Sequence, residues 1–96
     1  MKWSRTLAWT VKWVDAAVKE YKKLGKPAQV RIRDYLIERI AKADNPRQFG
    51  KALSGNLSGL WRYRVSNYRI VCRIDDDELV VLVLRVAHRS RVYEKS

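Results

Sequence analysis

The feature that most constrains this chain is the alternation of side chains along residues 60–74, which read LWRYRVSNYRIVCRI. Aromatic and aliphatic residues occupy one parity in each half of the stretch, and arginines recur on the other. A period of two with β-branched and aromatic residues is typical of half-buried strands. Two polar residues, Ser66 and Asn67, separate the two runs. The stretch therefore predicts a β-hairpin with a tight turn at Ser66-Asn67.

Pairing the two strands across this turn decides which side chains share a face of the sheet. Arg64 then meets Arg69, and Arg62 meets Val71. Opposed residues point to the same side of a sheet. The predicted arginine face holds Arg62, Arg64, Arg69 and Arg73, and the predicted core face holds Trp61, Tyr63, Tyr68, Ile70 and Cys72. Like charges opposed in a ladder destabilise it, so the arginine face either binds an anion or is well solvated, and the alternation alone leaves both open.

Size and charge limit the class of protein. The chain has 96 residues, which predicts one domain over residues 1–96. Its 21 basic and 10 acidic residues give a formal net charge of +11, and such surfaces usually bind nucleic acid, anionic membranes or acidic proteins. The longest apolar run, residues 79–84, is far shorter than the roughly 20 residues of a membrane-spanning helix, and we see no secretory signal pattern. We therefore expect a cytoplasmic protein without a membrane partner.

The segments before the hairpin predict one strand and two helices. Residues 6–14 alternate and are hydrophobic enough for a strand inside or near the middle of a sheet. Asp15 is a good N-cap for a first helix, which Gly25 would close. Pro27 fits the first turn of a second helix that continues to Ala43. The short link between them makes the two helices an antiparallel hairpin.

The remaining segments predict a loop, an acidic turn and a last strand. Residues 46–59 carry turn signals, and apolar residues within them are expected to anchor the loop to the core: Phe49, Leu53 and Leu57. The acidic residues 75–78 predict a solvated turn, and the apolar run after them predicts a buried strand. If Ile74 and Leu79 close that turn, Val71 faces Leu82.

Together these elements predict an α+β fold. An N-terminal strand and a two-helix antiparallel hairpin precede a three-stranded antiparallel meander. All strands would form one sheet with the helices on one face, covering the apolar side of the hairpin. The arginine face would stay open.

The residue types limit the chemistry. With one histidine, His88, and one cysteine, Cys72, we expect neither a metal site nor an internal disulfide, and nothing suggests a cofactor. No Gly-rich phosphate loop or Ser/His/Asp arrangement is visible. Arginine forks bind phosphate oxygens and stabilise charge that grows in a transition state, but they cannot act as bases. In RNA the adjacent 2′-hydroxyl can attack the phosphate, so a protein need only hold the strand, stabilise charge and move protons.

Three segments resemble a known family: GKALSG, LWRYRVSNYRIVCRI and VLRVAHRSRVY. With the order of elements, they resemble the RelE/ParE superfamily of bacterial toxins, and within it the RelE branch. The resemblance implies a small basic endoribonuclease that enters the ribosomal A site and cuts the mRNA by attack of the 2′-oxygen, leaving a 2′,3′-cyclic phosphate. The implied partners are the 70S ribosome with its mRNA and a cognate RelB-type antitoxin. DNA would be bound only through the antitoxin, at the operator.

The resemblance also assigns roles by position. Arg62, Arg64 and Arg69 would bind the scissile phosphate. Arg89 would stabilise or protonate the leaving 5′-oxygen, and Tyr93 would stack on or orient a base. Further RNA contacts are expected from Lys51, Arg73 and Arg91.

The general base is the open point in this assignment. The RelE branch has lysines at the positions of Arg62 and Arg64, and lysine can exchange a proton where arginine practically cannot. The base must then lie elsewhere. His88 is the first candidate, because an unperturbed imidazole titrates near pH 6.5, and Lys51 is the second.

Two other functions compete with the ribonuclease. A ParE-like inhibitor of DNA gyrase would share the fold but would not need the arginine cluster, His88 or Tyr93. A plain RNA-binding module would use the basic surface without catalysis. The joint presence of the cluster, His88 and Tyr93 favours the ribonuclease.

Overall fold

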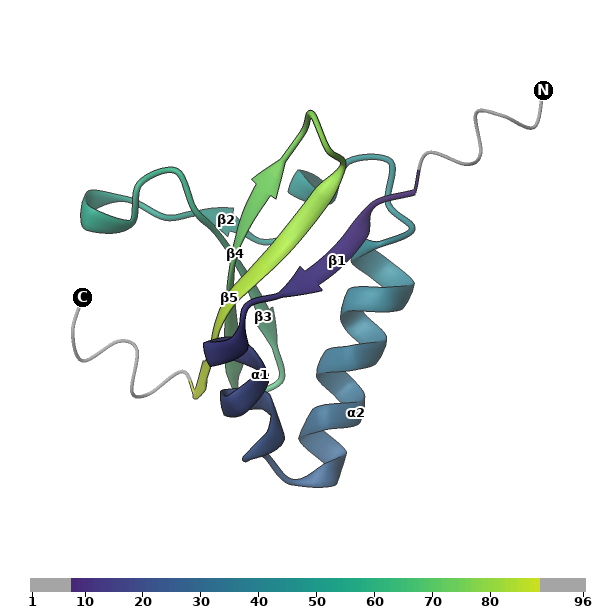
Figure 1. Cartoon of the computed structure of the whole chain (residues 1–96), viewed down its shortest axis with the longest axis vertical. Helices are drawn as coiled ribbons and strands as arrows, with labels where there is room; N and C mark the ends of the chain where they lie inside the picture. The colour runs from purple at the N-terminus through teal and green to yellow at the C-terminus, as the bar shows by residue number, and fades with distance from the viewer. Residues whose placement is uncertain (1–7, 89–96) are drawn as a thin grey trace.

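The computed structural model describes residues 8–88 as a five-stranded sheet with two helices packed on one face (Figure 1). The strands lie in the order β1-β5-β4-β3-β2. Their bounds are β1 Thr10–Trp13, β2 Lys51–Ala52, β3 Trp61–Val65, β4 Tyr68–Asp75 and β5 Val80–His88. The helical elements are α1 Asp15–Lys22, α2 Lys26–Asp34, its π-helical continuation η2 Tyr35–Ile40, and the 3-10 turns η3 Pro46–Gln48 and η4 Gly55–Leu57. The predicted α+β architecture and the antiparallel β3-β4-β5 meander are confirmed.

The helical hairpin forms as predicted, but its capping residues differ. Val14 is the N-cap of α1, without a side-chain cap bond, so Asp15 lies in the first turn rather than at the cap. There its carboxylate still interacts favourably with the positive end of the helix dipole. Gly25 does not close α1 in a left-handed conformation; it is the N-cap of α2, with φ −69°. The Tyr21 hydroxyl donates to the carbonyl of Gln29 (2.9 Å) and ties the two helices together.

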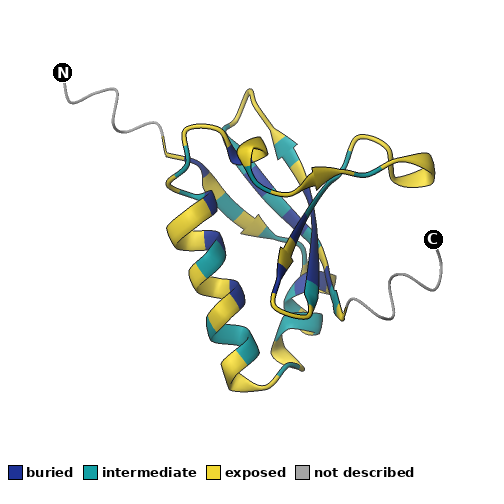
Figure 2. Cartoon of the chain, turned by 180° about the vertical axis from the view of Figure 1, so that it is seen from behind, coloured by how far each residue is buried: buried dark blue, intermediate teal, exposed yellow. Residues whose placement is uncertain are grey.

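The second helix begins with Pro27 in its first turn, as predicted, and ends in π geometry. The Ala41 N–H bonds to the carbonyl of Leu36 (2.8 Å), and the element ends at Ile40 rather than Ala43. Ile32, Leu36 and Ile40 form its buried stripe. Figure 2 shows the buried residues of this helix facing the sheet and the exposed ones facing outward. Within residues 8–88, no helix is long and apolar enough to cross a membrane.

The core lies between the two helices and one face of the sheet. Its members are Trp9, Ala17, Ile32, Leu36, Ile40, Tyr63, Val65, Ile70, Cys72, Val81, Val83 and Val86. The predicted core face of the hairpin is therefore the face that the helices cover. Trp61 and Tyr68 are partly buried against this core.

The N-terminal strand occupies a different place from the one predicted. It runs parallel to β5 at the edge of the sheet, whereas its hydrophobicity predicted a position near the middle. The expected strand began at residue 6, and its first residues lie outside the described range; the observed strand begins at Thr10. Apolar side chains suit this edge because Trp13 packs edge-to-face on Tyr21 of α1, with ring centroids 5.0 Å apart. The opposite edge is β2, a two-residue strand too short to leave an alternating pattern.

The register between β4 and β5 also differs from the prediction. Asp75 pairs with Val80, and Val71 pairs with Arg85 rather than Leu82. One cause is the turn, where Leu79 adopts a positive φ of 55° and leaves the pairing. The second is a β-bulge opposite Val71 and Cys72, which inserts an extra residue into β5. Beyond the bulge the alternation of β5 is inverted.

The loop before β3 is held by contacts that composition did not reveal. The buried Tyr63 hydroxyl donates to the carbonyl of Pro46 (2.8 Å), and the Trp61 indole N–H donates to the carbonyl of Phe49 (2.6 Å). Phe49 packs against the core as predicted. Leu57 does not, since it is 45% exposed in η4, which projects away from the sheet (Figure 1).

The acidic turn between β4 and β5 is more than a solvated loop. Asp76 accepts two bonds from the Arg47 guanidinium (2.9 and 3.1 Å), which joins the turn to η3. Asp75 accepts from the N–H groups of Asp77 and Glu78 (3.1 and 3.2 Å) and shapes the turn itself. The four acidic residues are exposed, as predicted for a solvated turn, and Asp75 and Asp76 make these bonds in addition.

Candidate nucleic-acid interface

The sheet face opposite the helices carries basic side chains from all five strands. Strand pairing places Arg64 opposite Arg69, Lys51 opposite Arg62, and Arg62 and Arg85 on either side of Val71. Leu82 lies between Arg73 and Lys12 in the same way. Opposed residues share a face. We call this surface the basic face; its members are Lys12, Lys51, Arg62, Arg64, Arg69, Arg73 and Arg85.

The basic face is graded in exposure. Arg69 is only 8% exposed, and its neighbour Val71 is buried to the same extent. Arg62 is half-buried, whereas Arg64 and Arg73 are exposed. The aliphatic stems of arginine can cover apolar neighbours while the charged ends reach solvent. The face therefore has a buried centre at Arg69 and exposed cations at its rim, which suits recognition of a phosphate backbone.

Lys51 reaches this face because the loop before it is clamped to β3. Gly50 has φ +75°, and a Cβ there would lie 2.2 Å from the carbonyl oxygen of Arg62 and 2.8 Å from the Tyr63 ring. Only glycine permits this close approach. The bond from the Trp61 indole to the carbonyl of Phe49 fixes the residue just before it. Lys51 is thereby held in register with Arg62 and exposed.

Two members of the basic face were missed by sequence reasoning. Lys12 was assigned to a strand but not to this face, because the parallel pairing of β1 with β5 leaves no local signal. Arg85 was missed because the bulge in β5 inverts the parity of the residues after Leu84. Its guanidinium Nε and Nη2 each lie 2.9 Å from the Oε2 atom of Glu20 in α1. A contact between residues 65 positions apart leaves no pattern in a single sequence.

His88 lies on the opposite side of the sheet from the arginines. It pairs with Tyr68 at the end of β5, and the two rings meet edge-to-face with centroids 5.4 Å apart. Tyr68 belongs to the helix-covered face. The residue that faces Arg69 is Ala87. The predicted site residues Arg89, Arg91 and Tyr93 lie outside the described residues.

The groups with clearly shifted pKa values all lie away from the basic face or within the core. Burial raises the pKa of Tyr63 far above its usual range, and nearby Cys72 and Tyr35 add to this. Burial raises the pKa of the Cys72 thiol to about 12, so the thiol stays protonated and inert. Burial also raises the pKa of Tyr35, against the opposing effect of Arg39. Among the described residues, no group of three or more His, Cys, Asp or Glu side chains could hold a metal ion.

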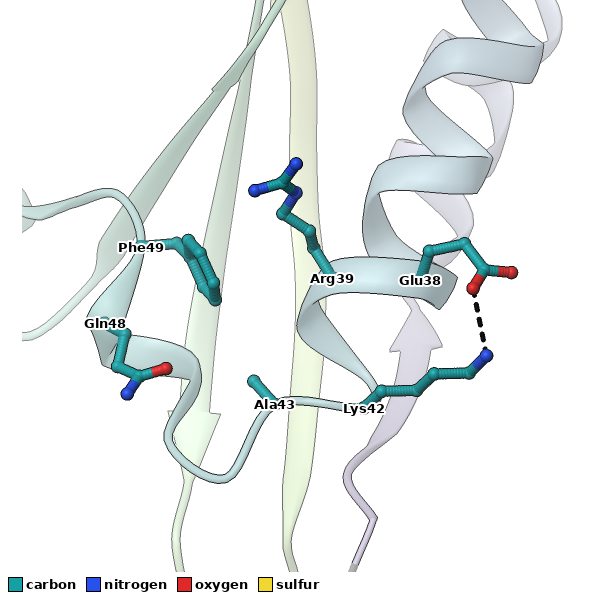
Figure 3. A pocket seen from close by; sticks show the side chains of 6 residues that line it. All are labelled: Glu38, Arg39, Lys42, Ala43, Gln48 and Phe49. Atoms are coloured by element: carbon teal, nitrogen blue, oxygen red, sulfur yellow. Dashed lines mark hydrogen bonds and ion pairs between the residues drawn. The ribbon is translucent and has the colours of Figure 1, made fainter.

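A shallow hollow on the helical side is a second, different polar site (Figure 3). Its lining residues are Glu38, Arg39, Lys42, Ala43, Gln48 and Phe49. The Arg39 guanidinium carbon lies 5.7 Å from the Phe49 ring centroid and 6.0 Å from that of Tyr35. Lys42 is bonded to Glu38 (2.9 Å). This hollow carries an acid beside its two cations, so it attracts an anionic strand less than the basic face, where cations predominate.

Comparison with known proteins gives a consistent set of similarities. The family model for the ParE toxin of the type II toxin–antitoxin system parDE matches residues 11–93. Toxin RelG of Mycobacterium tuberculosis is 28% identical over 89 residues, which are 93% of this chain and 100% of the relative. The mRNA interferase toxin RelE of Escherichia coli is 28% identical over 87 residues, 88% of this chain and 87% of the relative. The crystal structure of the toxin–antitoxin complex RelBE2 from Mycobacterium tuberculosis matches with a TM-score of 0.79 and 28% identity, over 88% of this chain and 95% of that chain.

Proposed function

The chain belongs to the ParE toxin family of type II toxin–antitoxin systems, within the RelE/ParE superfamily, and from this premise we propose that it is a ribosome-dependent endoribonuclease that cleaves mRNA in the A site. The observation that carries the proposal is the basic face. Strand pairing places Arg62, Arg64 and Arg69, from β3 and β4, on one face of the sheet. The name of the Escherichia coli relative, an mRNA interferase, points the same way.

In the proposed reaction the RNA supplies its own nucleophile. The 2′-oxygen attacks the adjacent phosphorus and loses its proton, the bond to the 5′-oxygen breaks, and that oxygen gains a proton. The products are a 2′,3′-cyclic phosphate and a 5′-hydroxyl. The phosphorane between these steps carries an extra negative charge, and Arg62, Arg64 and Arg69 stabilise it by charge-assisted hydrogen bonds. Arg89 stabilises the charge on the leaving 5′-oxygen, which takes its proton from water, and Tyr93 stacks on or orients a base.

Proton transfer from the 2′-hydroxyl needs a group other than arginine. Lys51 shares the basic face with Arg62, while the His88 ring packs against Tyr68 on the other side. We therefore assign the proton acceptor to Lys51 in preference to His88. Arg73 and Arg91 make further contacts with the RNA backbone.

The proposed partners follow from charge and from the similar complexes. A net charge of +11 favours both the ribosome with its mRNA and an acidic antitoxin. The matching crystal structure from Mycobacterium tuberculosis is a toxin–antitoxin complex. We assign a RelB-type antitoxin as the cognate inhibitor, with operator DNA bound only through it, and cytoplasmic action because the target is translated mRNA.

The test is primer extension on a translated message, with and without ribosomes. The wild-type protein should produce cuts within A-site codons only when ribosomes are present. Arg69→Ala should abolish the cuts and the growth arrest, and Arg64→Gln, an exposed position, should weaken both while the fold survives. Arg33→Ala removes an exposed cation from α2 and serves as the matched control. If Arg69→Ala and Arg64→Gln both remain toxic, the ribonuclease assignment is wrong.

Inhibition of DNA gyrase is the second candidate, because the matching family model is that of ParE toxins. It requires no RNA at the basic face. Cells producing the protein would then accumulate broken DNA while their messages stay intact. The same cultures used for primer extension decide between the two functions.

A further inference from the structure

Arg85 belongs to the basic face by register, but its charged end is held elsewhere. It pairs with Val71, whose partner on the other side is Arg62. Its guanidinium instead turns to the sheet edge, where both Nε and Nη2 lie 2.9 Å from Oε2 of Glu20. The side chain of Arg85 is 60% exposed and that of Glu20 is 27% exposed. The two ends of this ion pair are therefore not equally fixed.

The carboxylate end is fixed by the backbone of β5. Just after β1, the Val14 N–H donates to the carbonyl of Val83 in β5 (3.0 Å). Beyond it, within the described residues, α1 takes the place of a strand along this edge, and the Val86 N–H donates to Oε1 of Glu20 (2.7 Å). Glu20 therefore keeps a hydrogen bond whether or not Arg85 is bonded to it. Arg85 can leave the pair without stranding a buried carboxylate.

We propose that Glu20 keeps Arg85 from binding RNA. The basic face then binds a strand through Arg62, Arg64 and Arg69, without a contact from Arg85. This inference rests on the proposed function, because it takes RNA to be the ligand of the basic face. Non-specific affinity for a strand grows with each phosphate that a cation neutralises. Holding one cation back lowers binding to any RNA while leaving the centre around Arg69 intact. Glu20 is thus a positioning residue that acts through Arg85 and does not touch the substrate.

The test measures binding of a 2′-O-methyl RNA oligonucleotide, which cannot attack its own phosphate, by fluorescence anisotropy over a range of salt concentrations. In Glu20→Gln the amide oxygen still accepts from the Val86 N–H, but the charge that holds Arg85 is gone. One added phosphate contact steepens the slope of log K against log salt by about 0.7 for a single strand, which is about fivefold tighter binding at 0.1 M salt. The double variant Glu20→Gln/Arg85→Gln should return to the wild-type slope.

A matched control separates this effect from a change in net charge. Glu38→Gln removes the same charge and also releases a cation, Lys42, but at the hollow on the helical side. It should leave the slope unchanged. Equal effects of Glu20→Gln and Glu38→Gln would overturn the proposal, as would weaker binding by Glu20→Gln together with a lower melting temperature, which would make Glu20 merely structural.

The same assay separates failure of this inference from failure of the proposed function. If Arg64→Gln does not weaken RNA binding, RNA does not occupy the basic face and the proposed function fails. If Arg64→Gln weakens binding but Glu20→Gln does not strengthen it, RNA uses the face and only the role of Glu20 is refuted.

Discussion

Replacement of Gly50 by alanine should be among the most damaging single-methyl additions to this fold. The added Cβ would lie 2.2 Å from the carbonyl oxygen of Arg62 and 2.9 Å from the Trp61 indole nitrogen. The first of these atoms is backbone, held by the pairing of β2 with β3. The loop must therefore move as a whole, and it cannot do so without disturbing the bond from Trp61 to the carbonyl of Phe49.

The expected loss has two parts. Holding alanine in the left-handed region, at the φ of +75° seen for Gly50, costs about 1–2 kcal/mol. Relieving the overlap costs about 1–3 kcal/mol more, as for other overpacked sites. The free energy of unfolding should fall by about 2–5 kcal/mol, a large share of the roughly 5–15 kcal/mol that stabilises a domain. Lys51 should also lose its place beside Arg62, so any folded protein should cleave mRNA more slowly.

Gly55 provides the matched control. It too has a positive φ, +64°, but an added Cβ there meets nothing within 4 Å. Gly55→Ala should therefore lose only the conformational part, about 1–2 kcal/mol. Equilibrium unfolding in urea, followed by circular dichroism and tryptophan fluorescence, measures both variants. If Gly50→Ala is no less stable than Gly55→Ala, the close approach of the loop to β3 is not a constraint and the account of how Lys51 is positioned fails.

Three further predictions concern single side chains. The Arg47 hydrogen bonds lower the pKa of Asp76 below its ordinary value of 3.8, so their contribution to stability is present above that value and is lost as the pH falls through the lower folded-state pKa. The difference in urea midpoint between wild type and Arg47→Ala should therefore shrink over this acidic range. A constant difference would contradict the assignment. Cys72, with its pKa raised to about 12 by burial, should resist alkylation at pH 8 in the native protein and react in urea; rapid native labelling would show that the core opens. Lys51→Gln should slow mRNA cleavage at least tenfold, a loss of about 1.4 kcal/mol in transition-state stabilisation, with little change in ribosome binding. His88→Gln should slow cleavage less. If His88→Gln has the larger effect, the proton acceptor is His88.

The hairpin could be predicted because its information is local. The alternation on both sides of Ser66-Asn67 specifies the pairing, and each predicted pair from Val65–Tyr68 to Arg62–Val71 is confirmed. The turn itself has a positive φ of 57° at Ser66, its first central residue, as in a type II′ turn. A slip of one residue would place Tyr63 in solvent and arginines in the core, so the hydrophobic pattern and the turn favour the same register.

The parts that could not be predicted depend on contacts between distant segments. The β5 bulge has no composition signal, because apolar residues flank it on both sides. It is fixed by the partner strand and by the hydrogen bond that the Val86 N–H donates to the Glu20 carboxylate. The place of β1 at the edge depends on α1 covering Trp13 rather than on the strand's own hydrophobicity. For the candidate site, the arginines of the hairpin were found from the alternation, whereas Lys12 and Arg85 required the strand order and the bulge.

The helix-covered face of the sheet provides stability, and the basic face is available for binding. Placing Arg64 opposite Arg69 brings two like charges together across the strand pair, which costs free energy. The sheet tolerates this because the same strands bury Tyr63, Ile70 and Cys72 under the helices on the other face, where each large apolar side chain contributes about 1.5–3 kcal/mol. A bound anion would relieve the repulsion, so the basic face gains more from a phosphate than a neutral surface would. Substitutions at exposed positions of the basic face should therefore change binding and activity while the melting temperature stays constant or rises.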